Sequence, residues 1–268
     1  MAALALAATL SLLPGQTAAQ TLRGDFDMNG QVNISDVTSM INYLLTDSPG
    51  EPKPSDYDTL TVNGVPFVMV RVEGGVFTRT RFNGIQIETF SIGQTEVTQE
   101  MWNAVMGEQD DPPYTNKGKP KRPVNKASRD DCMAFIARLN ELTGLNFRLP
   151  TMNEWLYAAT GGRFTRSYPY AGSTDINEVA WWEDDNGYVQ NVGLKAPNEL
   201  FLFDMSGNVA EWCDEYHGND EYGYNGNLRG GYALSSMEEC LVDRAVISRP
   251  VDVRNVYNGF RIVMSTNE

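Results

Sequence analysis

Apolar residues recur at helical spacing in three segments of the chain, and each segment follows a Ser or Thr that can cap a helix. In the second segment, Cys132, Phe135, Ile136 and Leu139 form one apolar stripe. In the third, a glutamate stands three residues after the threonine, which is the pattern of a capping box. The sequence therefore predicts helices over residues 99–106, 129–142 and 152–160, capped by Thr98, Ser128 and Thr151.

Strand patterns are short and lie mainly before these helices. Val68–Val72 and Phe77 are expected to pair across a turn at residues 73–75, and residues 88–92 form a further candidate strand. After residue 162 the helical period is lost, and the 24 glycines and 13 prolines of the chain favour turns and loops. This mixture predicts an α+β domain with little regular structure over residues 59–268.

The chain begins with an apolar run at residues 2–13 that is too short to span a bilayer. Small residues at Thr17 and Ala19 follow it, as they do before the cleavage site of a secretory signal. We interpret residues 1–19 as a signal peptide that directs export to the cell surface, the outer membrane or the medium. The alternative is a buried N-terminal helix. In neither case is the protein expected to span a membrane.

Residues 25–36 carry oxygen-bearing side chains at the spacing of a calcium-binding loop. Gly30 stands where such a loop turns sharply, and the seventh position can offer its carbonyl. The alternative is a turn rich in Asp and Asn that holds no metal. The predicted Ca²⁺ ligands are Asp25, Asp27, Asn29, Gln31, Asn33 and Asp36.

Apolar residues at helical spacing follow this loop between residues 37 and 45. A calcium loop that leads into such a helix resembles one repeat of a type I dockerin, which implies a small EF-hand-like helical module over residues 20–46. A full dockerin has two loops and only one is found here, so the module is expected either to bind a docking partner or to act as a calcium-braced cap. Residues 47–58 contain three prolines and are expected to form a linker.

The net charge limits the classes of partner, and the number of cysteines limits the disulfide bonds that can form. A net charge of −14 without a basic cluster argues against a nucleic-acid partner, because phosphates would be repelled. In an exported chain, Cys132, Cys213 and Cys240 allow one disulfide and one free thiol. Three separate buried thiols are the alternative, and the sequence does not decide between them.

Four blocks of residues stand in order along the main domain. They are GQTEVTQ at 93–99, FRLPT at 147–151, DMSGNVAEW at 204–212, and a final pair of RGG at 229–231 with GFR at 259–261. As a set they resemble the formylglycine-generating enzyme family, also called sulfatase-modifying factors, over about residues 65–265. The resemblance implies an elaborated C-type-lectin-like domain with a small twisted sheet, packed helices and bound calcium.

The third block suggests a second calcium site. Asp204 and Glu211 are hard oxygen ligands joined by a Ser-Gly-Asn turn whose carbonyls can point inward. The resemblance implies that calcium is held by Asp204, Glu211 and the carbonyls of Gly207 and Val209. The alternative is an Asp and Glu pair on a solvated turn.

The family's enzymes oxidise a substrate cysteine with two copper-binding cysteines five residues apart. Counted from the double glycine, these positions fall on Ser235 and Cys240. A serine hydroxyl is a poor ligand for Cu(I), which prefers soft thiolates. We therefore expect this degenerate pair to be inactive and the chain to have no catalytic residue, although the oxidase of this class remains the alternative function.

The segment between the last two glycine motifs also resembles the display segment of the variable proteins of diversity-generating retroelements, which use this fold to bind ligands. Its intervening side chains are chemically mixed and without period, which suits a binding surface on a rigid frame. The resemblance implies a variable binding face over residues 232–257, and the alternative is an ordinary member of the family with a fixed ligand. The predicted binding residues are Tyr232, Leu234, Ser236, Met237, Glu238, Glu239, Val251, Val253, Asn255 and Tyr257.

The sequence thus favours an exported, calcium-stabilised protein that binds a protein or glycan on a cell or phage surface. A formylglycine-generating oxidase is the second hypothesis. A structural subunit that docks through residues 20–46 is the third.

Overall fold

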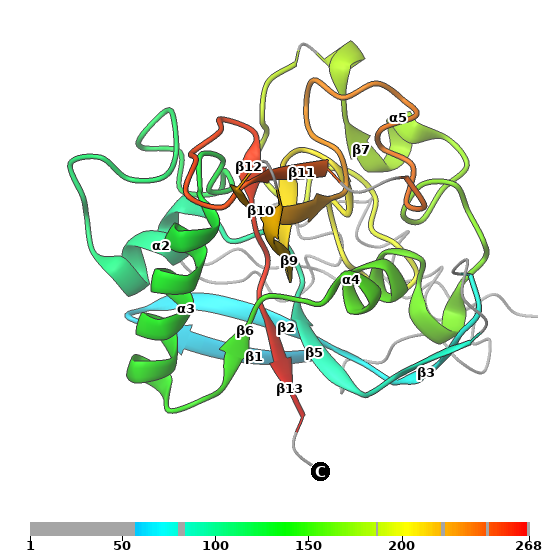
Figure 1. Ribbon diagram of the computed structural model, residues 1–268, viewed down its shortest axis with the longest axis horizontal. Coiled ribbons are helices and arrows are strands. Elements are labelled where there is room, and N and C mark those ends of the chain that lie inside the picture. The colour runs from blue at the N-terminus through cyan, green and yellow to red at the C-terminus, as the bar shows by residue number, and fades with distance from the viewer. Residues whose placement is uncertain (1–56, 80–83, 186, 221–222, 245–246, 267–268) are drawn as a thin grey trace, which may run out of the picture. The chain divides into compact units, whose positions relative to one another are not determined.

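The computed structural model describes residues 57–79, 84–185, 187–220, 223–244 and 247–266. The predicted signal peptide, the calcium loop with its EF-hand-like module, and residues 47–56 of the expected linker lie outside this part of the chain. The first described strand, β1, covers Tyr57–Val62 and so begins inside the stretch expected to be linker. The helices, strands and irregular segments that follow have the α+β character expected from the sequence (Figure 1).

A five-stranded sheet has the order β1-β2-β5-β13-β6, and all of its neighbouring strands are antiparallel. The last strand of the chain, β13, lies inside this sheet, so the residues before it are fixed from their C-terminal side. The bounds of the strands after β1 are β2 Val65–Val72, β5 Phe90–Gly93, β6 Phe147–Arg148 and β13 Val263–Ser265.

The predicted hairpin around residues 73–75 is wrong in its pairing. Strand β2 pairs with β1 and β5, whereas β3 (Gly75–Phe77) pairs with β4 (Ile85–Ile87) in a separate two-stranded sheet. Gly74 lies directly against this region, since a Cβ there would come within 2.3 Å of the Ile87 carbonyl oxygen. The glycine therefore carries the chain from one sheet to the next and does not turn β2 back on itself.

The three predicted helices are confirmed with their caps. Helix α2 covers Gln99–Met106, α3 covers Arg129–Thr143 and α4 covers Met152–Ala159. The Thr151 and Glu154 capping box forms as expected, and Ser128 forms a second one with Asp131. The short helix α5, Ile176–Val179, and the 3₁₀ turns η2 (Gly162–Phe164) and η3 (Glu183–Asp185) were not anticipated. Within the described residues, no helix combines the length and apolar composition needed to cross a bilayer.

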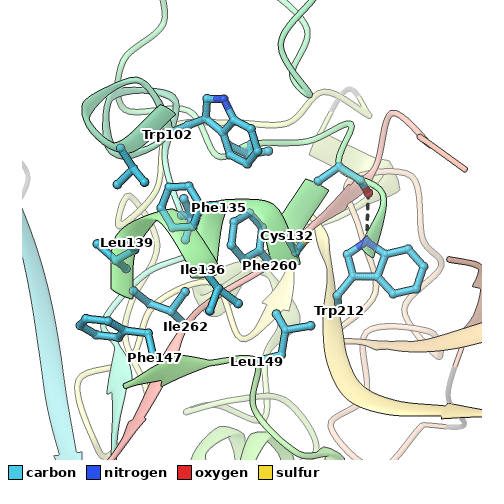
Figure 2. Packing of buried hydrophobic residues seen from close by; sticks show 14 of the residues in the cluster. Trp102, Cys132, Phe135, Ile136, Leu139, Phe147, Leu149, Trp212, Phe260 and Ile262 are labelled. Atoms are coloured by element: carbon cyan, nitrogen blue, oxygen red, sulfur yellow. Dashed lines mark hydrogen bonds between the residues drawn. The ribbon is translucent and has the colours of Figure 1, made fainter. Parts of the chain in front are cut away.

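The hydrophobic core joins α2 and α3 to the C-terminal end of the chain (Figure 2). Trp102 stacks on Phe135 with ring centroids 5.3 Å apart, and Phe260 meets Phe135 edge to face at the same separation. The indole nitrogen of Trp212 donates a hydrogen bond of 2.9 Å to the carbonyl of Ala127. Phe260, which closes the predicted display segment, is thus buried among helix residues.

A second sheet has the order β11-β10-β9-β12 and lies in the upper half of Figure 1, above the five-stranded sheet. Its short strand β12 is parallel to β9, and the remaining pairs are antiparallel. A further parallel pair joins β7 to β8. The bounds are β7 Ala180–Trp181, β8 Ser206–Gly207, β9 Ala210–Asp220, β10 Gly223–Arg229, β11 Ile247–Pro250 and β12 Asn258–Gly259.

Candidate functional site

The predicted display segment begins where β10 ends, at two glycines in left-handed conformations. Gly230 has φ of 96° and Gly231 has φ of 76°. A Cβ on Gly231 would come within 2.9 Å of the Glu239 carbonyl oxygen and 3.0 Å of the Cys240 sulfur. Both the dihedral angles and the close packing require glycine here, so the entry to the segment is fixed by backbone geometry.

The segment ends at a buried ion pair. Arg261 donates two hydrogen bonds of 2.8 Å, from Nε and Nη2, to the two carboxylate oxygens of Glu211 on β9. Its remaining hydrogen bonds go to the backbone carbonyls of Gly93, Gln94 and Phe203, so the whole guanidinium is engaged. The exit of the segment is therefore locked to the second sheet.

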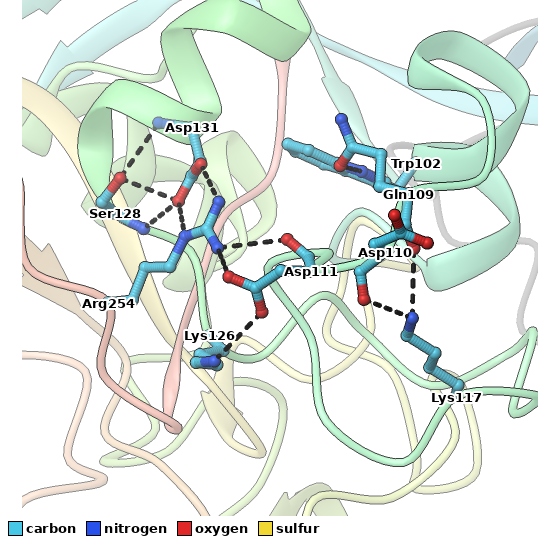
Figure 3. A network of polar contacts seen from close by, with 9 residues as sticks. All are labelled: Trp102, Gln109, Asp110, Asp111, Lys117, Lys126, Ser128, Asp131 and Arg254. Atoms are coloured by element: carbon cyan, nitrogen blue, oxygen red, sulfur yellow. Dashed lines mark hydrogen bonds and ion pairs between the residues drawn. The ribbon is translucent and has the colours of Figure 1, made fainter.

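Arg254 anchors the middle of the segment (Figure 3). It binds both oxygens of Asp131 at the N-terminus of α3, at 2.8 and 2.7 Å, and also binds the carboxylate of Asp111 at 2.9 Å. Burial alone would raise the pKa of Asp131, but hydrogen bonds from Arg254 and Ser128 outweigh it and lower the pKa. Lys126 adds a longer contact of 3.6 Å to Asp111.

The side chains between these anchors point largely outward. Tyr232 and Tyr257, from opposite ends of the segment, stack with ring centroids 4.9 Å apart, so the two ends share one surface. Of the ten predicted binding residues, Tyr232, Ser236, Val251 and Tyr257 are half-buried. The others are exposed, namely Leu234, Met237, Glu238, Glu239, Val253 and Asn255.

The two positions of the degenerate catalytic pair are both buried. The Ser235 hydroxyl accepts a hydrogen bond of 3.1 Å from the backbone nitrogen of Tyr232, so it holds a turn. Cys240 packs among Tyr170, Trp182 and other apolar residues. Burial raises the pKa of the Cys240 thiol to about 12, with smaller contributions from Glu239 and Glu183. Neither side chain is presented as a nucleophile or a soft metal ligand.

All three cysteines are free and buried, which decides between the two readings of the sequence in favour of separate thiols. Cys132 lies inside α3 and its sulfur donates to the Ser128 carbonyl at 3.2 Å. The pKa of Cys132 is raised well above its usual value, mainly by burial and further by Asp131.

The predicted second calcium turn lies in a buried group of charges. Asp204 and Glu211 are both buried, which excludes the reading of a solvated turn. Glu96 joins them from the loop before α2, where it accepts hydrogen bonds from the Val209 backbone and the Asn208 side chain. Sequence reasoning missed Glu96, although an acidic residue inside the first block was a usable signal. Three carboxylates therefore face the one guanidinium of Arg261.

Burial in this group raises the pKa of two of the acids. Burial raises the pKa of Glu96 well above its usual value, and Asp204 and Glu211 raise it further. Burial likewise raises the pKa of Asp204 to about 6, against a lowering hydrogen bond from Gly193. A bound cation would offset this excess of negative charge.

The fit of a calcium ion differs between the two predicted side-chain ligands. Asp204 Oδ1 is buried and has no hydrogen-bond partner among the described residues, which suits a ligand oxygen. Glu211 is already held by Arg261 and by the Trp155 indole at 2.7 Å. No group of three or more His, Cys, Asp or Glu side chains suited to a metal occurs in the described part of the chain. Calcium at Asp204, Gly207, Val209 and Glu211 therefore stays a prediction.

A second loop contacts the predicted display segment, and sequence reasoning missed this contact. Tyr188 is 67% exposed, and its neighbour Gly187 packs against Leu234 so closely that a Cβ there would lie 2.2 Å from Leu234 Cδ2. The Glu183 backbone nitrogen donates to the Ser235 carbonyl at 3.2 Å. No spacing or motif in the sequence connects these two loops, which lie far apart along the chain.

Comparison with known proteins places the described domain in a family. Residues 53–266 match the model of the sulfatase-modifying factor enzyme 1-like domain. The chain is 31% identical to the chaperone protein LppX of Paenibacillus barcinonensis, over 57% of this chain and 73% of that protein. It is also 31% identical to the inactive Cα-formylglycine-generating enzyme 2 of Bos taurus, over 37% of this chain and only 35% of that protein.

The fold is similar to that of Treponema denticola variable protein 1, a solved structure. The two superpose with a TM-score of 0.66 and 25% sequence identity, over 78% of this chain and 99% of the other. The resemblances predicted from the sequence are therefore confirmed for the family and for its variable-protein fold, whereas the dockerin-like part is not tested. The chain belongs to the FGE-sulfatase family, whose domain is the sulfatase-modifying factor enzyme 1-like domain.

Proposed function

We propose that this chain is a ligand-binding member of its family that displays residues 232–257 and has lost the oxidase chemistry. One observation carries the proposal. The segment is fixed at Gly231, Arg254 and Arg261, while six of its ten predicted binding side chains remain exposed between these anchors. A frame held at both ends and in the middle lowers the entropic cost of binding.

The state of the former catalytic pair supports the same proposal. Ser235 supplies no thiol, and the Cys240 thiol is buried with a raised pKa. Copper-dependent oxidation of a cysteine needs soft, ionisable sulfur ligands at the surface that meets the substrate. These side chains instead stabilise the turn that supports the exposed residues around them.

The comparisons support binding over catalysis in a further way. The similarity to Treponema denticola variable protein 1 extends over almost the whole of that protein. The inactive formylglycine-generating enzyme 2 of Bos taurus is a relative whose name records lost activity. Because the match covers about a third of that relative, we take from it only that the family includes inactive members.

The setting of the binding event is also part of the proposal. We propose that the chain is exported through residues 1–19 and acts at the cell surface or outside the cell, with a protein or glycan of a cell or phage surface as ligand. Calcium bound at residues 25–36 would brace the N-terminal module, and residues 20–46 could supply a docking contact. Asp204 would act as a ligand of the second ion.

The test is an array of surface proteins and glycans probed with the full chain, first with Ca²⁺ and then with a chelator. Binding should fall at least about tenfold when Met237 and Val253, both exposed, are changed to Asp. Val76, exposed on β3, gives the matched control Val76→Asp, which should bind as the wild type does. Equal binding by the wild type, the Met237→Asp/Val253→Asp double variant and Val76→Asp would exclude the display segment as the binding surface.

The oxidase alternative is tested directly. Purified chain is incubated with copper and a cysteinyl peptide under air, and the peptide mass is followed. We expect no aldehyde and no stoichiometric copper. Conversion of the peptide would overturn the proposal, whatever the array shows.

A further inference from the structure

A segment made of residues 183–185 and 187–188 contacts the turn of residues 234–239 and extends the predicted display surface beyond the C-terminal segment. Leu234 lies over Gly187, whose lack of a side chain leaves room for it. Next to this contact, Tyr188 is 67% exposed, Leu234 47% and Met237 43%. Tyr188 directly follows Gly187 in the chain, and an exposed Tyr is an anchor of the kind that dominates protein interfaces.

The same two segments carry unpaired negative charge. Glu183, Asp184, Glu238 and Glu239 are exposed, and none forms an ion pair with any residue in the described part of the chain. The Glu183 backbone nitrogen donates to the Ser235 carbonyl at 3.2 Å, so the two segments that carry these acids lie together. Lys195 is paired with the neighbouring Asp185 at 3.3 Å and lies over the Trp181 ring.

From this juxtaposition we propose that Tyr188 and Leu234 form one apolar ridge that inserts into a hollow of a partner protein rimmed by Lys or Arg. The inference rests on the proposed function and deepens it, because it assigns the partner's chemistry and adds a residue from outside residues 232–257. The four carboxylates steer the basic rim toward the ridge, and the ridge supplies the desolvated centre of the contact.

Charge and side-chain chemistry favour a protein over a glycan at this place. Anionic glycans would be repelled by the four acids. A neutral sugar needs many hydrogen-bonding groups, whereas the centre of this surface offers the aliphatic side chains of Leu234 and Met237. A protein surface with basic and apolar residues complements both the four carboxylates and the apolar side chains of this chain.

The experiment is selection of a random 12-residue peptide library, displayed on phage, against the immobilised full chain. We expect the enriched peptides to combine one or two large apolar residues with Lys or Arg. A synthetic peptide of this kind should bind at least about tenfold more weakly to Tyr188→Ala and to Leu234→Ala. Its affinity should also fall on raising the salt from 50 to 500 mM, because the rim contacts are screened.

Val76→Ala is the matched control, since Val76 is 63% exposed on β3 and should leave affinity unchanged. Thermal unfolding checks that each variant is folded. Peptides with no excess of basic residues, or peptides that bind Tyr188→Ala as tightly as wild type, would overturn the inference.

The outcomes separate this inference from the proposed function. If peptide binding survives in Tyr188→Ala but is lost in Met237→Asp with Val253→Asp, the display segment binds and the ridge does not. If a glycan array gives specific binding while the library gives none, the proposed function stands and the protein partner is wrong. If no probe is sensitive to either surface, both proposals fall.

Discussion

Arg261 and Glu211 form a fully buried ion pair that joins the last motif of the chain to strand β9. Their side chains are 0% and 1% exposed, and two hydrogen bonds of 2.8 Å connect them. The pair is bidentate and further held by Trp155 and three backbone carbonyls. Removal of one partner would leave the other charge buried and uncompensated.

We therefore expect Arg261→Met to lower the free energy of unfolding by about 3–5 kcal/mol. Urea unfolding at pH 7 measures this value. Glu211→Gln should cost a similar amount, and the double variant should cost less than the two added together, because both single variants remove the same Arg261–Glu211 interaction. Arg79→Met provides the control, since Arg79 pairs with the half-exposed Asp243 and should cost below about 1 kcal/mol. A cost for Arg261→Met as small as that of the control would contradict the role of the buried pair.

The helices could be predicted because their signals are local. Thr98, Ser128 and Thr151 each cap the helix that follows, and the apolar stripe of α3 is buried as its spacing predicts. The fixed backbone at Gly230 and Gly231 and the buried Phe260 and Arg261 agree with the scaffold role that the Gly-Gly and Gly-Phe-Arg motifs suggested, whereas the display role of the segment between them stays a prediction.

The strand pairing and the grouping of the site residues could not be predicted, because they depend on contacts between residues far apart in the sequence. Strand β2 pairs with β5 and not with β3 because Gly74 lies against the β4 end, which no turn pattern records. Glu96 joins Asp204 and Glu211 only through the fold. The contact of Gly187 with Leu234 likewise joins two loops without regular structure, where periodicity carries no information.

Arg254 should stabilise the display segment in a pH-dependent way. Because hydrogen bonds hold the pKa of folded Asp131 below its unfolded value of 3.8, the contribution is fully present above that value. It is lost as the pH falls through the lower folded pKa. We expect Arg254→Ala to cost about 1–3 kcal/mol at pH 7 in urea unfolding, and progressively less from pH 4 downward. Arg249→Ala, at an exposed arginine of β11, should show neither the cost nor the pH dependence.

The cysteines should be unreactive while the chain is folded. All three are free and buried, and burial raises the pKa of Cys132 and Cys240, so almost no thiolate is present at pH 8. An Ellman assay of the native protein should show no fast reaction, and three thiols should react in guanidinium chloride. A rapidly reacting native thiol would show that one of the three cysteines is accessible, and fewer than three thiols after unfolding would show that a disulfide forms.

Calcium should bind at separable sites if both predictions from the sequence hold. Calorimetric titration of the chelator-treated full chain is expected to give two classes of site, one lost in Asp25→Ala and the other in Asp204→Ala. Asp204 is the more informative residue to change, because its buried Oδ1 has no hydrogen-bond partner among the described residues and is free to bind an ion. The carboxylate of Glu211 is already bound to Arg261. Asp184→Ala is a control in an exposed acidic loop and should change neither site. Unaltered titration of Asp204→Ala would remove calcium from that turn.

Gly187 should matter for binding as well as for folding. A Cβ at this position would lie 2.2 Å from Leu234 Cδ2, and the φ of 65° is unfavourable for alanine. Gly187→Ala should therefore displace the exposed Leu234 and weaken a selected basic peptide by about tenfold, the loss expected of an interface anchor. The free energy of unfolding should fall by only about 1–2 kcal/mol, the cost of one strained residue. Gly118→Ala is the matched control, because Gly118 has a φ of 82° and open space around it. Gly118→Ala has the same backbone cost but no contact with Leu234 or Tyr188, so its peptide affinity should be unchanged.

Equal peptide affinity in Gly187→Ala and Gly118→Ala would show that the position of Leu234 does not set the shape of the binding surface.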